Sequence, residues 1–255
     1  MASPLLIGVA ALFAIFVPQQ AGAQSLLQEH LKSDASSEQT SKNETSPQQA
    51  SDPPVDSPPK GHEDLDATLW VRCAAEYKAI TRQTFAAATR QLILAMASSD
   101  WTAIPNGKSA TGSSVLQGKP ARPVCVIMDV DETVLDNSAY QRDLILNDSS
   151  FTGESWSRFV KEKVSTAVPG AKSFVDTCRR LGVVVFFVTN RDFSLEEATR
   201  ENLISEGLMM PSDPDLIFSK NEQPEWTSGK SVRRDSIAAK NRVCLLYTSD
   251  AADDA

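Results

Sequence analysis

Four carboxylates crowd the end of one apolar run in this sequence. The stretch "CVIMDVDETVLDN", residues 125–137, places Asp129, Asp131, Glu132 and Asp136 directly after hydrophobic residues. Asp129 and Asp131 are two positions apart, so in an extended chain their side chains point to the same side. Two carboxylates that close need a cation, and Mg²⁺ prefers oxygen ligands and bridges to phosphate oxygens. The stretch predicts a metal site for phosphoryl chemistry, with an acidic surface loop or a calcium site as the alternative.

Phosphoryl transfer would give the two aspartates different tasks. Asp129 can attack phosphorus, while Asp131 can protonate the leaving oxygen and then activate water, and both are candidate Mg²⁺ ligands. Such chemistry also needs hydrogen-bond donors and a cation around the phosphoryl oxygens. Thr189 and Asn190 follow a second apolar run and would supply hydroxyl and amide donors to the substrate. Lys230 opens a predicted helix and would supply the cation, unless it is a plain surface lysine.

Alternating strands and helices must position these side chains. Apolar runs predict strands at 124–130, 182–191, 215–220 and 242–246. Helices are predicted over 66–99 (one or two, with Asp66 as N-cap), 139–167, 170–181, 194–207 (Ser194 as N-cap, Gly207 as C-cap) and 231–240. The run "GVVVFFVTNR" is apolar on both faces, which is typical of a central parallel strand. This pattern predicts an α/β three-layer sandwich with a parallel sheet, whose ligands bind at the carboxyl ends of the strands.

Composition excludes several other chemistries. The chain has 255 residues and a formal charge of −8, which argues against non-specific nucleic-acid binding. His30 and His62 both precede the predicted folded domain, so that domain cannot use a histidine nucleophile, a Ser-His-Asp triad or a histidine-ligated zinc. The cysteines match no zinc-binding spacing and are expected to be free thiols rather than a disulfide: Cys73, Cys125, Cys178 and Cys244.

Residues 1–23 predict a secretory signal peptide. Leu5–Val17 is an apolar run too short to span a bilayer, and Ala21-Gly22-Ala23 fits an A-x-A cleavage site. Because no Lys or Arg precedes the apolar run, an uncleaved anchor is the alternative. Residues 24–64 are rich in Ser, Gln and Pro and predict a disordered linker. We therefore expect an exported protein, periplasmic or secreted, without a membrane span in its mature form.

Several motifs in this order resemble a known family. "DVDETVLDNSAYQ", "VPGA", "GVVVFFVTNR" and "SGKSVRR..I" are similar to the haloacid-dehalogenase (HAD) superfamily, and most of all to its exported bacterial acid phosphatases of the lipoprotein, class C (subfamily IIIB) type. Upstream, "ATLWVRCAAEYKAI" and "WTAI" fit the same group, so the resemblance covers about 66–243. It implies a HAD-like Rossmannoid core with a small helical cap and N-terminal helices. It also implies a Mg²⁺-dependent acid phosphatase that acts on small phosphomonoesters, often nucleoside 5′-monophosphates, through an aspartyl-phosphate.

The resemblance also implies roles for individual residues. Asp129 matches the family's nucleophile, Asp131 its acid/base with a backbone carbonyl on Mg²⁺, Thr189 the hydroxyl of its second motif and Lys230 the lysine of its third.

Family members grip the base of a nucleotide with aromatic side chains. Tyr140 and Trp156 lie in the stretch that should form the cap and are the candidates here, with ordinary core aromatics as the alternative. Relatives carry a second Trp where Phe159 stands, and many of them are lipid-anchored.

The match to the family stops near the end of the chain. A fourth motif, "G-D-N-L-x-D", should complete the Mg²⁺ shell after the last strand, but the chain reads "RVCLLYTSDAADDA". Asp250 and Asp254 mimic the spacing, yet residues 244–255 resemble a translated sequencing adapter. We therefore expect an incomplete domain over 65–243, a last strand that ends near Val243, and a truncated chain with weak activity or none.

Two other functions remain open at this point. One is a non-catalytic binding or storage relative on the same fold, although such a protein would be expected to have lost the nucleophile Asp129. The other is a phosphotransferase that passes the aspartyl-phosphate to an alcohol, which would use the same residues.

Overall fold

Four parallel strands form the central sheet of this protein, in the order β5-β4-β1-β6. The structure is a computed structural model and describes residues 64–104 and 122–248. The strands are β1 (Val124–Met128), β4 (Val184–Asp192), β5 (Ile217–Lys220) and β6 (Arg242–Tyr247). The predicted α/β fold with a parallel sheet is confirmed. Since the strands are parallel, their carboxyl ends meet at one edge, where ligands bind in such folds.

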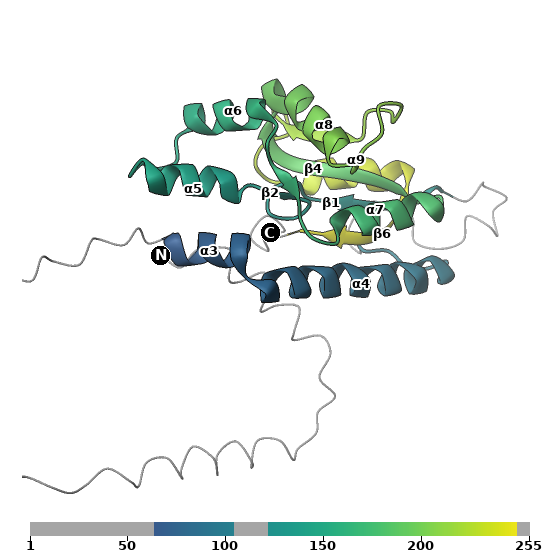
Figure 1. Ribbon diagram of the computed structural model, residues 1–255. Helices are drawn as coiled ribbons and strands as arrows, with labels where there is room; N and C mark the ends of the chain where they lie inside the picture. The colour runs from purple at the N-terminus through teal and green to yellow at the C-terminus, as the bar shows by residue number, and fades with distance from the viewer. Residues whose placement is uncertain (1–63, 105–121, 249–255) are drawn as a thin grey trace, which may run out of the picture. The chain divides into compact units, whose positions relative to one another are not determined.

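Side chains of the sheet alternate between two apolar layers. Val126 and Met128 belong to one buried cluster, whereas Cys125 and Ile127 belong to the other, as expected for successive residues of a strand. Helices complete both clusters, which gives the predicted three layers, and Figure 1 shows α4 running below β6 and α7. The first cluster includes residues of α4 (Ala75–Ala97), α7 (Ala171–Arg180) and α8 (Glu196–Ser205), and the second includes residues of α9 (Ser231–Lys240).

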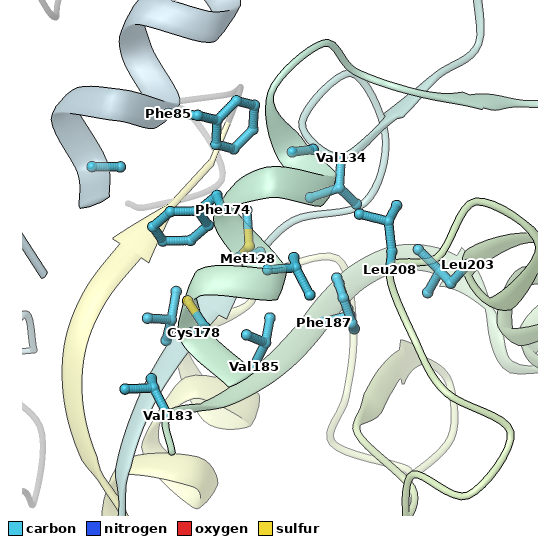
Figure 2. Packing of buried hydrophobic residues seen from close by; sticks show 14 of the residues in the cluster. Phe85, Met128, Val134, Phe174, Cys178, Val183, Val185, Phe187, Leu203 and Leu208 are labelled. Carbon is cyan, nitrogen blue, oxygen red and sulfur yellow. The ribbon is translucent and has the colours of Figure 1, made fainter. Parts of the chain in front are cut away.

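The larger apolar cluster lies between the sheet and the helices α4 and α7 (Figure 2). Phe174 and Cys178 of α7 pack there with Met128 and Phe187 of the strands, and Phe85 reaches in from α4. All five side chains are buried. Truncation of Phe174 or Phe187 to alanine should therefore lower the free energy of unfolding by about 3–5 kcal/mol. This packing fixes the positions at which β1 and β4 end, and therefore the positions of the functional side chains that follow.

A small cap is inserted after β1. Residues 139–167, predicted as one helical stretch, instead contain two helices and a short strand, so that prediction is wrong in detail. The elements of the cap are β2 (Leu135–Asp136), α5 (Ser138–Leu146), α6 (Gly153–Glu162) and β3 (Thr166–Ala167), with β2 and β3 antiparallel.

Local interactions divide this stretch. Thr152 caps α6 by accepting a hydrogen bond from the Ser155 amide at 3.1 Å, and the Ser155 hydroxyl accepts one from the Thr152 amide at 3.3 Å. This reciprocal capping box starts a new helix. Lys163 then takes a left-handed conformation with φ of 57° and ends it.

Two N-terminal helices precede the sheet, as expected. They are α3 (Leu65–Cys73) and α4, and they meet at Ala74, whose backbone is extended. The N-cap of α3 is Asp64 rather than Asp66, which lies inside the first turn. Among the described residues, no helix is both long and apolar enough to cross a membrane.

The caps of α8 also differ from prediction. A 3₁₀ turn at Phe193–Leu195 precedes the helix, so Ser194 is not its N-cap; the Ser194 amide instead donates to Asp192 at 3.0 Å. At the other end the C-cap is Glu206, and Gly207 follows it with φ of +71°. That conformation suits glycine because it has no Cβ.

The last strand is longer than expected. β6 pairs with β1 as far as Tyr247, four residues beyond Val243. The Trp101 indole N–H donates to the Cys244 carbonyl at 2.8 Å, which ties this strand to the segment after α4. Asp250, Asp254, the predicted signal peptide and residues 24–63 of the predicted linker lie outside the described residues.

The four cysteines are free thiols. Cys125, Cys178 and Cys244 are buried, and Cys73 is exposed.

Candidate active site

Asp129 and Lys230 form a buried ion pair at the carboxyl edge of the sheet. Asp129 follows β1 directly, and Lys230 is the N-cap of α9. The Lys230 Nζ lies 2.9 Å from the Asp129 Oδ2, and the two side chains are only 2% and 9% exposed. Burial raises the pKa of Asp129 to about 6, although the Lys230 ammonium opposes this shift. The lysine that the sequence predicted for this site therefore contacts the predicted nucleophile.

The backbone around Asp129 fixes the direction of its carboxylate. The Asp129 amide donates to the Tyr247 carbonyl of β6 at 2.9 Å, and the Asp129 Oδ1 accepts from the Val130 amide at 2.7 Å. The carboxylate is therefore held from both sides, by its own loop and by Lys230.

Asp131 has a different set of partners. Its Oδ1 accepts from the Arg191 Nε at 3.0 Å and Nη2 at 2.8 Å, and from the Asn137 Nδ2 at 2.8 Å. The Asp131 side chain is 26% exposed, whereas the Arg191 side chain has no accessible surface. A rigid guanidinium and an amide thus orient the predicted acid/base.

Arg191 is a site residue that we did not predict from the sequence. Besides Asp131, it donates to the Thr199 Oγ1 and the Asn137 Oδ1, each at 3.2 Å. Its Cζ also lies 5.5 Å from the ring centroid of Trp156, within the range of a cation–π contact. The available signal was the basic residue directly after "TN" at a strand end, where side chains should face the acid cluster.

Thr189 and Asn190 lie at the same sheet edge as Asp129. Met128 pairs with Phe187, so the residues that follow on β1 and β4 run side by side. The Thr189 side chain is fully buried, and its Oγ1 accepts from the Arg191 amide at 3.1 Å. The Asn190 Oδ1 accepts from the Arg233 Nη2 at 2.8 Å. This bond fixes the orientation of the Asn190 side-chain amide.

Tyr140 and Trp156 belong to a compact aromatic cluster in the cap. Their ring centroids are 5.2 Å apart, and Phe159 lies 5.3 Å from Tyr140 and 5.7 Å from Trp156. Tyr140 is buried and its hydroxyl forms a hydrogen bond of 2.7 Å with the Ser155 Oγ. This packing favours a core role for Tyr140, whereas Trp156 remains half-buried beside Arg191. Contact of either ring with a substrate stays a prediction.

Glu132 occupies a strained position between the aspartates and the cap. Its φ of 53° is left-handed, which is uncommon for a residue with a side chain. Burial and the neighbouring Asp131 raise the pKa of Glu132 to about 8, with a smaller contribution from Asp136. Burial and the neighbouring aspartates therefore favour the protonated form of Glu132.

The donor set at this edge suits Mg²⁺. Asp129 and Asp131 offer only oxygen ligands, and Mg²⁺ is usually bound by one or two carboxylates, water and substrate phosphates. Within 64–104 and 122–248, no three Asp, Glu, His or Cys side chains gather into one metal-binding group. Asp129 and Asp131 are therefore the candidate magnesium ligands among the described residues.

Comparisons with known proteins bear on the family and the fold of this chain. A family model described as HAD superfamily, subfamily IIIB (Acid phosphatase) matches residues 62–254. A crystal structure of a Class C acid phosphatase from Bacillus anthracis with tungstate bound has a TM-score of 0.56 and 24% identity, covering 72% of this chain and 67% of that chain. Another structure of the Class C acid phosphatase from Bacillus anthracis has a TM-score of 0.54 and 25% identity, covering 71% and 65%. This chain therefore spans about two thirds of the length of both, and they share its fold.

Proposed function

We propose that this chain hydrolyses phosphomonoesters through a phosphorylated Asp129. The chain belongs to the acid phosphatases of HAD subfamily IIIB, and its enzyme class is that of a phosphomonoesterase. The observation that carries this proposal is the buried pair of Asp129 and Lys230 at 2.9 Å. A carboxylate in such a place is costly unless a cation accompanies it. An arriving phosphoryl group can take over the lysine as its own partner, which frees the Asp129 Oδ2 for attack.

The proposed reaction has two steps. In the first, an oxygen of Asp129 bonds to phosphorus, the ester P–O bond breaks, and Asp131 gives its proton to the leaving alcohol. In the second, Asp131 takes a proton from water, the water oxygen bonds to phosphorus, and the bond between phosphorus and Asp129 breaks. Inorganic phosphate leaves and both carboxyl groups return to their starting forms.

The surrounding residues support the phosphoryl oxygens in this proposal. The Thr189 hydroxyl and the Asn190 amide lie at the same edge and can donate hydrogen bonds, and Lys230 can donate beside the amides that open α9. Arg191 would keep Asp131 in one orientation during both proton transfers.

HAD superfamily enzymes generally use Mg²⁺. Here the Asp129 carboxylate and the Asp131 backbone carbonyl would hold it, and the ion would neutralise charge on the phosphoryl oxygens. In this proposal the Asp131 side chain, whose Oδ1 accepts from Arg191 and Asn137, carries out the proton transfers.

Phosphate release tests the proposal directly. The chain is incubated with p-nitrophenyl phosphate or a nucleoside 5′-monophosphate, with Mg²⁺ or with EDTA, beside its Asp129→Asn variant. We expect release that needs both Mg²⁺ and Asp129. Equal release by the variant, or release that EDTA leaves unchanged, would contradict the proposal. An added alcohol separates hydrolysis from transfer, because a phosphotransferase would yield the phosphorylated alcohol.

We also propose that the protein is exported, from the predicted signal peptide at residues 1–23. N-terminal sequencing of the exported protein should give Gln24 as its first residue. Recovery of the whole chain from the cytoplasm alone would contradict export.

A further inference from the structure

We propose that Arg233 is the positioning residue of the phosphate-binding half of the site. It holds the end of β4, which carries Thr189 and Asn190, in register with the loop that carries Lys230. The inference deepens the proposed function, but its structural part does not depend on turnover.

Arg233 lies on α9 and is completely buried. Its Nη1 donates to the Thr189 carbonyl at 2.5 Å and to the Phe218 carbonyl of β5 at 3.3 Å. Its Nη2 donates to the Asn190 Oδ1 at 2.8 Å and to the Thr227 carbonyl at 2.9 Å. One guanidinium therefore joins two neighbouring strand ends to the loop that precedes α9.

Three of these bonds, those to Thr189, Asn190 and Thr227, act on segments that carry functional side chains. The bond to the Thr189 carbonyl fixes the peptide whose side chain faces the sheet edge, and the bond to the Asn190 Oδ1 fixes which way its amide nitrogen points. Thr227 lies three residues before Lys230, so its bond to Arg233 restrains the approach of that lysine to Asp129. Thr189 and Lys230 are 41 positions apart in the sequence (230 − 189), so their mutual placement depends on such a tertiary link.

Burial of a guanidinium is expensive unless its N–H groups find acceptors, and a hydrophobic side chain is often as good for stability. The described acceptors of Arg233 are three main-chain carbonyls and one side-chain amide oxygen, with a fourth carbonyl, that of Gly229, at a weak 3.5 Å. The planar fork can span them, while a lysine has a single nitrogen on a flexible stem. The arrangement therefore positions Thr189, Asn190 and the loop before Lys230, and it requires the burial of a charged guanidinium.

Arg242 offers a matched control. It also donates from a guanidinium to three main-chain carbonyls, those of Ala95, Met96 and Ser98, at 2.8–3.3 Å. However, it lies at the start of β6, at the opposite end of the strands from the site. Loss of this clamp should loosen the end of α4 and leave the site as it is.

The experiment compares Arg233→Lys and Arg233→Met with Arg242→Lys and Arg242→Met in the full chain. Three quantities are measured for variants whose circular dichroism shows a folded protein: hydrogen exchange by peptide, affinity for tungstate as an oxyanion probe, and kcat and KM for p-nitrophenyl phosphate. If Arg233→Met does not fold, the result for Arg233→Lys decides the test.

In Arg233→Lys we expect faster exchange in peptides covering 189–191 and 227–230. Misplacement of a site by about 1 Å can cost on the order of 100-fold in rate. We therefore expect tungstate affinity and kcat each to fall by about tenfold or more, with a smaller change in KM. Arg242→Lys should change exchange only near 95–98 and β6, and should leave tungstate affinity and kcat within about twofold of the wild type.

Unchanged exchange at 189–191 and 227–230 in Arg233→Lys would overturn the inference, whether or not the wild type has activity. Equal losses of affinity and rate in the Arg233 and Arg242 variants would also overturn it, because they would show a general loss of stability. Phosphate release that Asp129→Asn leaves unchanged would refute the proposed function but not the role of Arg233. If the wild type neither binds tungstate nor releases phosphate, the exchange result alone decides that role.

Discussion

Asp129 and Asp131 belong to one short motif but lie in two contrasting pockets. In the Asp129 pocket, a buried carboxylate faces the single ammonium of Lys230. In the Asp131 pocket, a partly exposed carboxyl group is held by the fork of Arg191 and by Asn137. Lysine is a flexible point charge, whereas arginine binds through a fixed planar geometry. The first pocket can therefore rearrange around an arriving phosphoryl group, and the second keeps its proton-transfer group in one place.

This contrast comes from segments that are distant in the sequence. Lys230 reaches the site from the start of α9 and Arg191 from the end of β4. The motif supplies the carboxylates, and the later segments give each carboxylate its task.

The largest expected effect is on the Asp129 pocket. Asp129→Asn keeps the shape of the side chain but removes the nucleophile, so phosphate release should fall on the order of 10⁴-fold or more. Steady-state assays with p-nitrophenyl phosphate measure this loss. A variant that keeps a tenth of the activity would show that the two pockets do not differ in the way proposed. A binding protein on this fold would show no change in ligand affinity.

A smaller loss is expected in the Asp131 pocket, and it should depend on the leaving group. Asp131→Asn should lower kcat for an alkyl phosphate by roughly 10²–10⁴-fold, the usual contribution of acid–base catalysis. p-Nitrophenolate leaves without a proton, so formation of the phosphoenzyme from its ester should be affected less. Rapid-mixing measurements of the first turnover compare the two esters, and equal losses for both would contradict the acid role.

A third prediction concerns pH and stability without metal. The pKa of Asp129 is raised to about 6 in the folded protein, above its ordinary value of 3.8. The folded state thus binds more protons than the unfolded state between these values, and this group's contribution makes the free energy of unfolding fall as pH rises. A shift of about two units corresponds to at most about 3 kcal/mol.

Urea denaturation in EDTA from pH 4 to pH 7 measures this slope. Asp129→Asn should flatten it, and Lys230→Met should extend the fall to higher pH because the opposing ammonium is gone. A wild-type slope that Asp129→Asn leaves unchanged would assign the titration to other groups.

The smallest effect is expected at the cap side of the Asp131 pocket. Trp156→Leu removes the ring beside Arg191, so it should destabilise the protein by about 0.5–1 kcal/mol more than Trp156→Phe, which keeps an aromatic face. Thermal unfolding of the two variants measures the difference. Equal stabilities would show that the ring contributes only apolar contact to Arg191.

The sequence predicted the parts of the site that follow from local pattern. The apolar run before Asp129, the run before Thr189 and the helix after Lys230 predicted three segments whose ends meet, and the structure places all three at one edge. Arg191 and Arg233 could not be predicted in the same way, because an arginine in a sequence is most often exposed. Their burial depends on acceptors that only the folded sheet brings together.

The cap and the last strand illustrate a second reason. Residues 139–167 have helical composition, but the Thr152 capping box and the left-handed Lys163 divide them. β6 continues to Tyr247 because β1 offers an edge for parallel pairing, which resumes after a register shift between Cys125 and Val126. In both cases a local cap or a neighbouring strand, rather than hydrophobic periodicity, decides where an element ends.

The most direct test of the account is to trap the phosphorylated enzyme. The Asp131→Asn variant is mixed with Mg²⁺ and p-nitrophenyl phosphate, quenched in acid, digested and examined by mass spectrometry. Since p-nitrophenolate needs no proton but the second step needs a base, a phosphoryl group should accumulate on the peptide that contains Asp129. It should be absent from the Asp129→Asn, Asp131→Asn double variant. Release of p-nitrophenolate with no modified Asp129, or with the phosphoryl group on another residue, would contradict the central claim.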